Sequence, residues 1–364
     1  MLTELGNWIE QGLTWVIEHL DEPLWNITIV ILLGVGLFFT ITTGLVQLRL
    51  FPASIREMWF GRAAEGNSLT PFQAFATGLA SRVGVGNISG VATAIALGGE
   101  GAVFWMWVTA LIGMSSAFVE SSLAQLFKIR DYDNHHFRGG PAYYITQGLG
   151  QKWLGIVFAL SLIFCFGFVY EAVQTNTIAV TAKAAWGWDE HAVGVALVIM
   201  TAPIIFGGIR RVSRFAEMLV PLMATLYLLM ALYIIITNIS LIPHVFGQIF
   251  DSAFNFEAAG GGLLGGLISQ TMMIGIKRGL YSNEAGMGSA PMAAAAAKTD
   301  HPVRQALVSM TGTFLDTIVV CSITGIEQTT MVKPELSGAA LTTVTFQKML
   351  PGIGGWIVTI GLIF

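Results

Sequence analysis

The chain has 364 residues, of which 54% are hydrophobic and 11% are charged, and its formal net charge is −4. With a mean hydropathy of +0.70, this composition excludes an ordinary water-soluble domain and predicts that lipid surrounds most of the chain. The length leaves room for about nine or ten spans of about 20 residues each. We therefore expect one all-α polytopic membrane domain covering residues 1–364, with the lipid bilayer as a partner and no nucleic acid.

The amino-terminal segment, residues 1–23, is acidic and has apolar residues at helical spacing, which predicts an amphipathic helix on the membrane surface. Apolar windows then predict nine spans. Their approximate bounds are 24–48, 72–97, 102–127, 153–178, 191–209, 215–237, 260–285, 304–326 and 341–364.

Basic residues set the expected orientation of these spans. Most Lys and Arg fall in connections on one side of the alternating topology, and this side is the cytoplasmic one in membrane proteins. The amino terminus and its helix are therefore expected outside a bacterial-type cytoplasmic membrane. Cys165 and Cys321 lie in apolar runs and are expected to be buried thiols without a disulfide.

Two of the predicted spans contain glycines and polar residues near mid-membrane. The span at 72–97 includes Ser81-Arg82-Val83-Gly84-Val85-Gly86-Asn87, and the span at 260–285 runs through Gly275 to Gly286. Unpaired backbone groups are costly in lipid unless they face protein, ions or a watery cavity. Both spans are thus predicted to be broken helices that form a binding site.

Each broken span begins a set of five, because the first repeat would cover 72–237 and the second would start at 260. A five-span repeat must return upside down, so the count predicts an inverted five-plus-five architecture, with 24–48 as an extra peripheral span. The second repeat, 260–364, would then be incomplete, which leads us to expect a chain truncated at its carboxyl end.

Three stretches of sequence closely resemble the alanine or glycine:cation symporter family. They are Gly84 to Ile95 with Gly98 to Trp107, Gly139 to Ile145, and Lys277 to Pro291. The resemblance implies eleven spans, ten of them arranged as in the bacterial leucine transporter. It also implies symport of alanine or glycine with Na⁺ or H⁺ and no enzymatic activity. Val85 departs from the Thr often found in the family, which leaves the substrate range open.

The predicted site combines these arguments. The half-helix starting near Asn87 directs free N–H groups at the break and suits a carboxylate, while backbone carbonyls around the break suit Na⁺. Asn87 could instead only hydrogen-bond the broken backbone. The candidate substrate residues are Val85, Gly86, Asn87 and, from the resemblance, Gln174, Met272, Met273, Ile274 and Gly275. The candidate cation ligands are the carbonyls of Arg82, Val83, Gly84 and Val85.

Several charged residues are expected within the membrane, where they are functional candidates or structural pairs. Arg82 and Glu284 belong to the two breaks and could form a gate or a fixed ion pair. Asp316 could bind a cation or accept a hydrogen bond from a neighbouring helix. No resident cofactor or metal site is predicted, and no phosphate-binding loop supports an ATP-driven pump.

The leading functional hypothesis is a carrier that imports alanine or glycine with a cation, most simply Na⁺, by alternating access. A channel or ion pore would also use broken helices and backbone carbonyls. An intramembrane enzyme would have only Glu120 and Glu171 as catalytic candidates.

Overall fold

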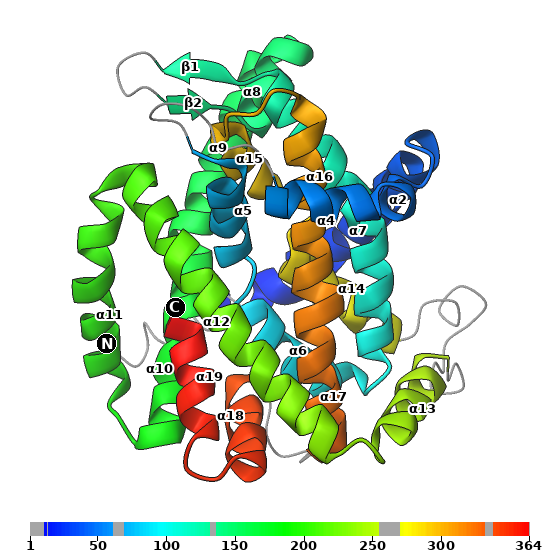
Figure 1. The fold of residues 1–364 in the computed structure, drawn as a ribbon, viewed down its shortest axis with the longest axis vertical. Helices are drawn as coiled ribbons and strands as arrows, with labels where there is room; N and C mark the ends of the chain where they lie inside the picture. Colours follow the sequence, from blue (N-terminus) through cyan, green and yellow to red (C-terminus); the bar gives the residue numbers. More distant parts are fainter. Residues whose placement is uncertain are drawn as a thin grey trace.

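The structure, a computed structural model, describes residues 11–12, 14–60, 69–131, 136–254, 270–331 and 338–363. It is mostly helical, as the composition predicts, with one short β-hairpin (Figure 1). The α-helices are α2 (Glu22–Thr42), α3 (Val46–Arg49), α4 (Phe51–Phe60), α5 (Pro71–Ala80), α6 (Val85–Gly98), α7 (Ala102–Leu126), α8 (Pro141–Gly148), α9 (Lys152–Phe164), α10 (Glu171–Trp186), α11 (Glu190–Ile205), α12 (Gly208–Thr237), α13 (Ile242–Ala253), α14 (Gln270–Asn283), α15 (Ala290–Ala296), α16 (Pro302–Thr313), α17 (Ser322–Met331), α18 (Gly338–Met349) and α19 (Gly354–Ile363). The π-helical segments are η1 (Ile17–Asp21), η2 (Cys165–Tyr170) and η4 (Phe314–Cys321), and the strands are β1 (Ile129–Asp131) and β2 (His136–Arg138).

Four helical stretches in the described residues are long and apolar enough to cross a membrane: Pro23–Thr42, Ala102–Leu126, Lys152–Trp186 and Pro302–Ile326. The third joins α9, η2 and α10 into 35 residues and is longer than the predicted 153–178. Large apolar side chains such as Leu160, Phe164 and Phe168 are more than 60% exposed, as expected of side chains that face lipid. These features fit a multi-pass helical membrane protein.

The last predicted span differs from the structure. Residues 341–364 contain two short helices, α18 and α19, separated by a turn at Leu350–Ile353. Pro351 and Gly352 interrupt the helix, and Gly352 has a φ of 85°, which glycine adopts without strain. Residues 1–10 and 13 of the predicted surface helix and residues 260–269 of the span at 260–285 lie outside the described residues.

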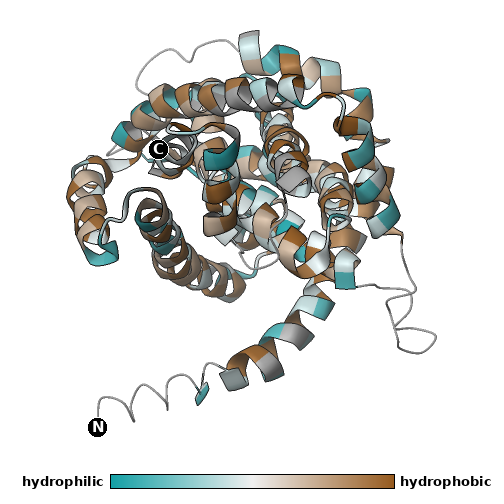
Figure 2. Ribbon diagram, turned by 90° about the horizontal axis from the view of Figure 1, so that it is seen from below, coloured by the Kyte–Doolittle hydropathy of each residue, from teal (hydrophilic) through white to brown (hydrophobic). Residues whose placement is uncertain are grey.

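Helix α7 packs against α2, α14 and α16, on the right of the bundle in Figure 1. Its side chains Val103, Met106 and Ala110 are completely buried. Glycine allows the close approach, because a side chain at Gly279 of α14 would collide with Thr109 of α7. Figure 2 shows the same bundle end-on, with α2 leaving it towards the amino terminus.

The two interrupted spans, α5–α6 and α14–α15, run antiparallel along their whole length. Leu69, just before α5, forms a parallel bridge with Ala297, just after α15. In the middle, Asn87 of α6 contacts Ser282 of α14. At the other end, Gln270 at the start of α14 donates to the carbonyl of Leu97 near the end of α6. The arrangement brings the two breaks side by side.

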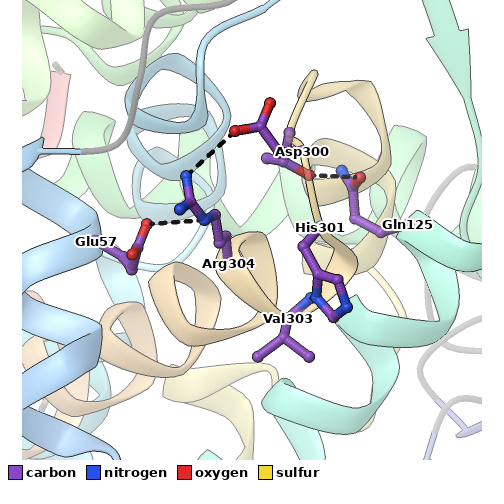
Figure 3. A network of polar contacts seen from close by, with 7 residues as sticks. Glu57, Gln125, Asp300, His301, Val303 and Arg304 are labelled. Atoms are coloured by element: carbon purple, nitrogen blue, oxygen red, sulfur yellow. Dashed lines mark hydrogen bonds and ion pairs between the residues drawn. The ribbon is translucent and has the colours of Figure 1, made fainter.

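A polar network ties the chain after α15 to neighbouring helices (Figure 3). Arg304 of α16 contacts Glu57 of α4 at 3.8 Å and Asp300 at 3.4 Å. Thr299 donates to Gln125 of α7 at 3.1 Å, and the ring nitrogen of His301 caps α16 by accepting from the N–H of Val303. The end of the second interrupted span is therefore anchored to α4 and α7.

Candidate functional site

The first break lies at Ser81–Gly84, between α5 and α6, inside the predicted region. Asn87 is completely buried, and its Oδ1 accepts from the N–H of Gly84 at 3.0 Å. This hydrogen bond caps the start of α6 and satisfies one of the N–H groups that have no partner within the helix. Asn87 therefore hydrogen-bonds the backbone at the break, which is one of the two roles expected from the sequence.

The second break lies at Glu284–Ser289, between α14 and α15. It starts later than the sequence suggested, because α14 stays helical through Asn283. Glu284 has a φ of 53°, and Gly286 and Gly288 both have a φ of 86°. Left-handed residues at these alternate positions cannot continue a right-handed helix, so this break is built into the backbone.

A buried polar network connects the two breaks. Asn87 Nδ2 lies 3.1 Å from Ser282 Oγ and 2.8 Å from Asp316 Oδ1. The second carboxylate oxygen of Asp316 accepts from Ser282 Oγ at 2.9 Å and from Thr317 Oγ1 at 2.8 Å. Cys321 Sγ lies 3.2 Å from both Asn87 Nδ2 and Ser282 Oγ. Each of these side chains is at most 1% exposed. Asn87 thus does more than cap its own helix.

Asp316 reaches this network from η4, a π-helical segment between α16 and α17. A π-helix is rare and is often found at functional sites, because its wider turn redirects side chains. Asp316 is completely buried and has no ion pair with any described residue. A buried carboxylate of this kind favours a cation nearby.

Arg82, Glu284 and Glu120 form a second buried cluster beside the breaks. Arg82 donates from Nη1 to Thr313 at 3.4 Å, whereas its Nε and Nη2 have no hydrogen-bond partner. Glu284 accepts from Ser81 at 3.4 Å. Glu120 is 7% exposed, and its Oε1 has no hydrogen-bond partner among the described residues. Arg82 and Glu284 do not form a direct ion pair within 4.0 Å, so a gate between them stays a prediction.

The remaining candidates of the first break lie around the network. A side chain at Gly84 would meet Gln174 Nε2 at 2.9 Å, which places Gln174 of α10 beside the break. Gly86 packs against the backbone of Ser282, and Val85 is 6% exposed in an apolar cluster. The Gly84 carbonyl already accepts from the N–H of Ile88, and Val83 is half-buried.

The candidates from the start of α14 lie elsewhere. Met272 and Met273 pack against the cluster of Ile29, Ile276 and Leu280, near α2. Ile274 contacts Gly98 at the end of α6, and Gly275 contacts Ala102 and Trp105 of α7. Gly275 is seven residues, or about 10 Å along the helix, from Ser282. The structure therefore brings Asn87 and Asp316 together, places Gln174 beside Gly84, and leaves 272–275 apart from them.

Sequence reasoning missed Ser282, Thr317 and Cys321 as members of the network. Ser282 lies inside the motif around the second break, and Thr317 follows Asp316 directly. Both could have been found from these neighbours, which give a local sequence signal. Cys321 had none, because a cysteine in an apolar run is usually only packed. Both cysteines are free, but only Cys321 is buried as expected; Cys165 is half-buried.

Comparison with known proteins gives this geometry a context. The model of the sodium:alanine symporter family matches residues 10–364. The chain belongs to this family.

Curated relatives are similar over most of the chain. An uncharacterized transporter of Haemophilus influenzae is 64% identical over 323 residues, which cover 89% of this chain and 67% of that protein. The amino-acid carrier protein AlsT of Bacillus subtilis is 48% identical, covering 93% and 71%. The sodium/alanine symporter AgcS of Methanococcus maripaludis is 47% identical, covering 92% and 76%.

The two carboxylates considered for an enzyme lie in different environments. Glu120 is 7% exposed beside the second break, whereas Glu171 is exposed at the start of α10. Membership of the sodium:alanine symporter family agrees with a protein that is not an enzyme.

Proposed function

We propose that this chain is a secondary active symporter that imports a small neutral amino acid, alanine or glycine, together with Na⁺ by alternating access. One observation carries the proposal: Asn87 from the first break and Asp316 from η4 meet at 2.8 Å between two interrupted antiparallel spans. The match to the sodium:alanine symporter family supports the coupling of an amino acid to a cation.

The proposed Na⁺ site lies at the Asp316 network. Na⁺ prefers oxygen ligands, and the carboxylate of Asp316 is surrounded by the oxygens of Ser282 and Thr317. A cation here would offset the buried negative charge of Asp316, which no basic side chain neutralises through a direct ion pair among the described residues. The predicted carbonyls of residues 82–85 would complete the cation site.

The proposed substrate seat lies at the start of α6. Free N–H groups and the positive end of the helix dipole suit the carboxylate of an amino acid. Gln174 borders Gly84 closely, so a small substrate fits this place better than a large one. Residues 272–275 would contribute to the pocket only in another conformation of the carrier.

The architecture proposed for this cycle is the inverted repeat, with 72–237 as the first half and the second half beginning at 260. The antiparallel course of α5–α6 and α14–α15 supports it, because inverted repeats place their broken helices in this way. The amino terminus would lie outside the cytoplasmic membrane. Arg82 and Glu284 would act as a gate that changes partners when the site opens.

The test uses the full chain in proteoliposomes and follows labelled alanine and glycine with an inward Na⁺ gradient, an inward H⁺ gradient or neither. We expect saturable accumulation with Na⁺ alone. In Asp316→Asn, the Na⁺ concentration for half-maximal uptake should rise by about tenfold or more, since a charge that holds the ion is lost. Thr93→Ala is the matched control, because Thr93 hydroxyl donates only within its own helix.

Other outcomes would contradict the proposal in distinct ways. Accumulation driven by H⁺ alone would shift coupling to buried carboxylates such as Glu120 and Glu284. Non-saturable ion current without amino-acid accumulation would indicate a channel. No uptake of either amino acid under any gradient would reject the substrate assignment.

A further inference from the structure

A cavity lies between the start of α2, Leu97 near the end of α6 and the stretch Ile274–Tyr281 of α14. Its volume is about 320 Å³. Its lining includes Asp21, Trp25, Leu97, Lys277, Arg278 and Tyr281. Tyr281 lines the cavity, whereas the next residue, Ser282, belongs to the buried network between the breaks. The cavity and the proposed transport site are thus neighbours along α14 but have different linings.

The cavity holds more positive than negative charge. Lys277 and Arg278 are half-buried, and neither has an ion pair with a described residue. Asp21 is the one carboxylate in the described lining, and it is exposed. Basic side chains within a membrane-spanning helix are costly unless they pair with an anion or reach the interface. An anionic group bound here would satisfy both cations.

On the α2 side, the cavity lies at the start of the apolar span Pro23–Thr42, where a spanning helix reaches the lipid headgroups. Lys277 Nζ lies 5.7 Å from the ring centroid of Trp25, which stands in the first turn of α2. Lysine side chains extend in this way from a membrane helix towards the interface, where Trp and Tyr are enriched. The arrangement is that of a headgroup pocket rather than of a buried core site.

Exposed apolar side chains lie along α2 and at Leu97, which lines the cavity. Leu24 and Ile27 on α2 are both 59% exposed, and Leu97 is 56% exposed. Helix α2 packs on α7 and, through Ile29, on Ile276 and Leu280 of α14, and Figure 2 shows its first turns leaving the bundle. An acyl chain can therefore lie along α2 while its headgroup enters the cavity.

We propose that this cavity binds the phosphate of an anionic lipid, held by Lys277 and Arg278 between α2 and α14. A guanidinium can bind phosphate through two parallel hydrogen bonds, and an ammonium adds a point charge. The exposed apolar side chains of α2 provide the surface for the lipid chains. The same basic pair could accept a carboxylate from a soluble solute, and the experiment separates these two sources.

The test measures lipid retention by native mass spectrometry of the full chain released from vesicles of phosphatidylglycerol and phosphatidylethanolamine. The variant is Lys277→Gln/Arg278→Gln. The matched control is Lys152→Gln/Lys348→Gln, which removes the same charge from exposed positions. We expect the apparent Kd of the tightest phosphatidylglycerol to rise by about tenfold or more in the variant and to stay unchanged in the control. Equal retention by variant and wild type would overturn the proposal.

Two further arms keep the result decisive. In phosphatidylcholine vesicles without anionic lipid, we expect labelled alanine binding to be the same in variant and wild type; loss of alanine binding in the variant would assign the cavity to a solute carboxylate and overturn the lipid site. If the double variant fails to fold, wild-type protein is photolabelled with a diazirine phosphatidylglycerol. Labelling should map to peptides 21–25 and 274–281 and be displaced by phosphatidylglycerol but not by phosphatidylcholine. Labelling confined to other segments would reject the site.

Discussion

The two breaks that face each other in this protein are made in different ways. At Ser81–Gly84 no residue adopts a left-handed φ, and the helix restarts on a cap provided by the side chain of Asn87. At Glu284–Ser289 the backbone itself turns left-handed at Glu284, Gly286 and Gly288. The first break depends on a side chain, and the second depends on backbone conformation.

Because the two breaks are built differently, substitutions in the first should change transport and substitutions in the second should change stability. Asn87 has two tasks, because it caps α6 and also reaches Asp316 and Ser282 across the gap. A substitution there should change ion and substrate handling. The glycines of the second break adopt the left-handed backbone conformation that turns the chain. Their substitution should therefore mainly lower the free energy of unfolding. The predictions below test this division, from the largest expected effect to the smallest.

Asn87→Ala should reduce Na⁺-driven alanine uptake by about 10- to 100-fold. The change leaves the Gly84 N–H without its acceptor and removes a donor from Asp316, and each unsatisfied buried group costs about 1–3 kcal/mol. Initial uptake rates in proteoliposomes measure the effect. Thr93→Ala, on the same helix, should transport like wild type; wild-type transport by Asn87→Ala would show that Asn87 serves only as structure.

Gly288→Ala should lower the free energy of unfolding by about 1–3 kcal/mol more than Gly150→Ala does. Both glycines have positive φ, at 86° and 70°. A side chain at Gly288 would lie 2.6 Å from Phe158 and 2.7 Å from Pro141, whereas nothing lies within 4 Å at Gly150. Unfolding in mixed detergent and SDS gives both values, and equal losses would show that the second break can relax.

Thr70→Ala should lower the free energy of unfolding by about 1 kcal/mol at any pH from 6 to 10. Thr70 caps the start of α5, and its hydroxyl accepts from the N–H of Gln73 at 3.1 Å while Gln73 Oε1 accepts in return. The same unfolding titration measures the loss. Thr77→Ala should be nearly neutral, because Thr77 hydroxyl donates only to the carbonyl of Gln73; a similar loss there would argue against capping as the cause.

The smallest effect is expected at the end of the second interrupted span. Lys128 donates to the carbonyl of Ala297 at 2.7 Å and to Gln125 Oε1 at 2.6 Å, and its ammonium lies 4.3 Å from the Phe137 ring. Burial lowers the pKa of Lys128 from 10.5 to about 8. Between these values the unfolded chain binds more protons than the folded one, so this group makes stability rise with pH.

Lys128→Met should therefore remove part of the rise in thermal stability between pH 8 and pH 10.5. The difference between the wild-type and variant melting temperatures should grow with pH across this window and stay constant below it. Exposed Lys152→Met serves as control and should leave the curve unchanged. A constant difference at every pH would mean that Lys128 keeps its proton in the folded chain.

Several of these features could be predicted from the sequence, and others could not. Helix breakers such as Gly84 and Gly86 in an apolar span are a local signal, so the first break was predicted within a few residues. The second break was expected too early, because Gly275 and Gly279 are there for close packing on α7 rather than for a turn. The sequence does not distinguish a glycine that allows close helix packing from one that allows a turn. Only the position of the neighbouring helix shows which role applies.

The sequence by itself determined the class of the protein, the presence of two broken spans and the family resemblance, since hydropathy and motifs are local properties of the chain. The tertiary structure alone decided that Asn87, Ser282, Asp316 and Cys321 meet, and that residues 272–275 do not join them. Such contacts depend on how antiparallel helices are aligned and on the π-helical turn that redirects Asp316, which are long-range consequences of packing.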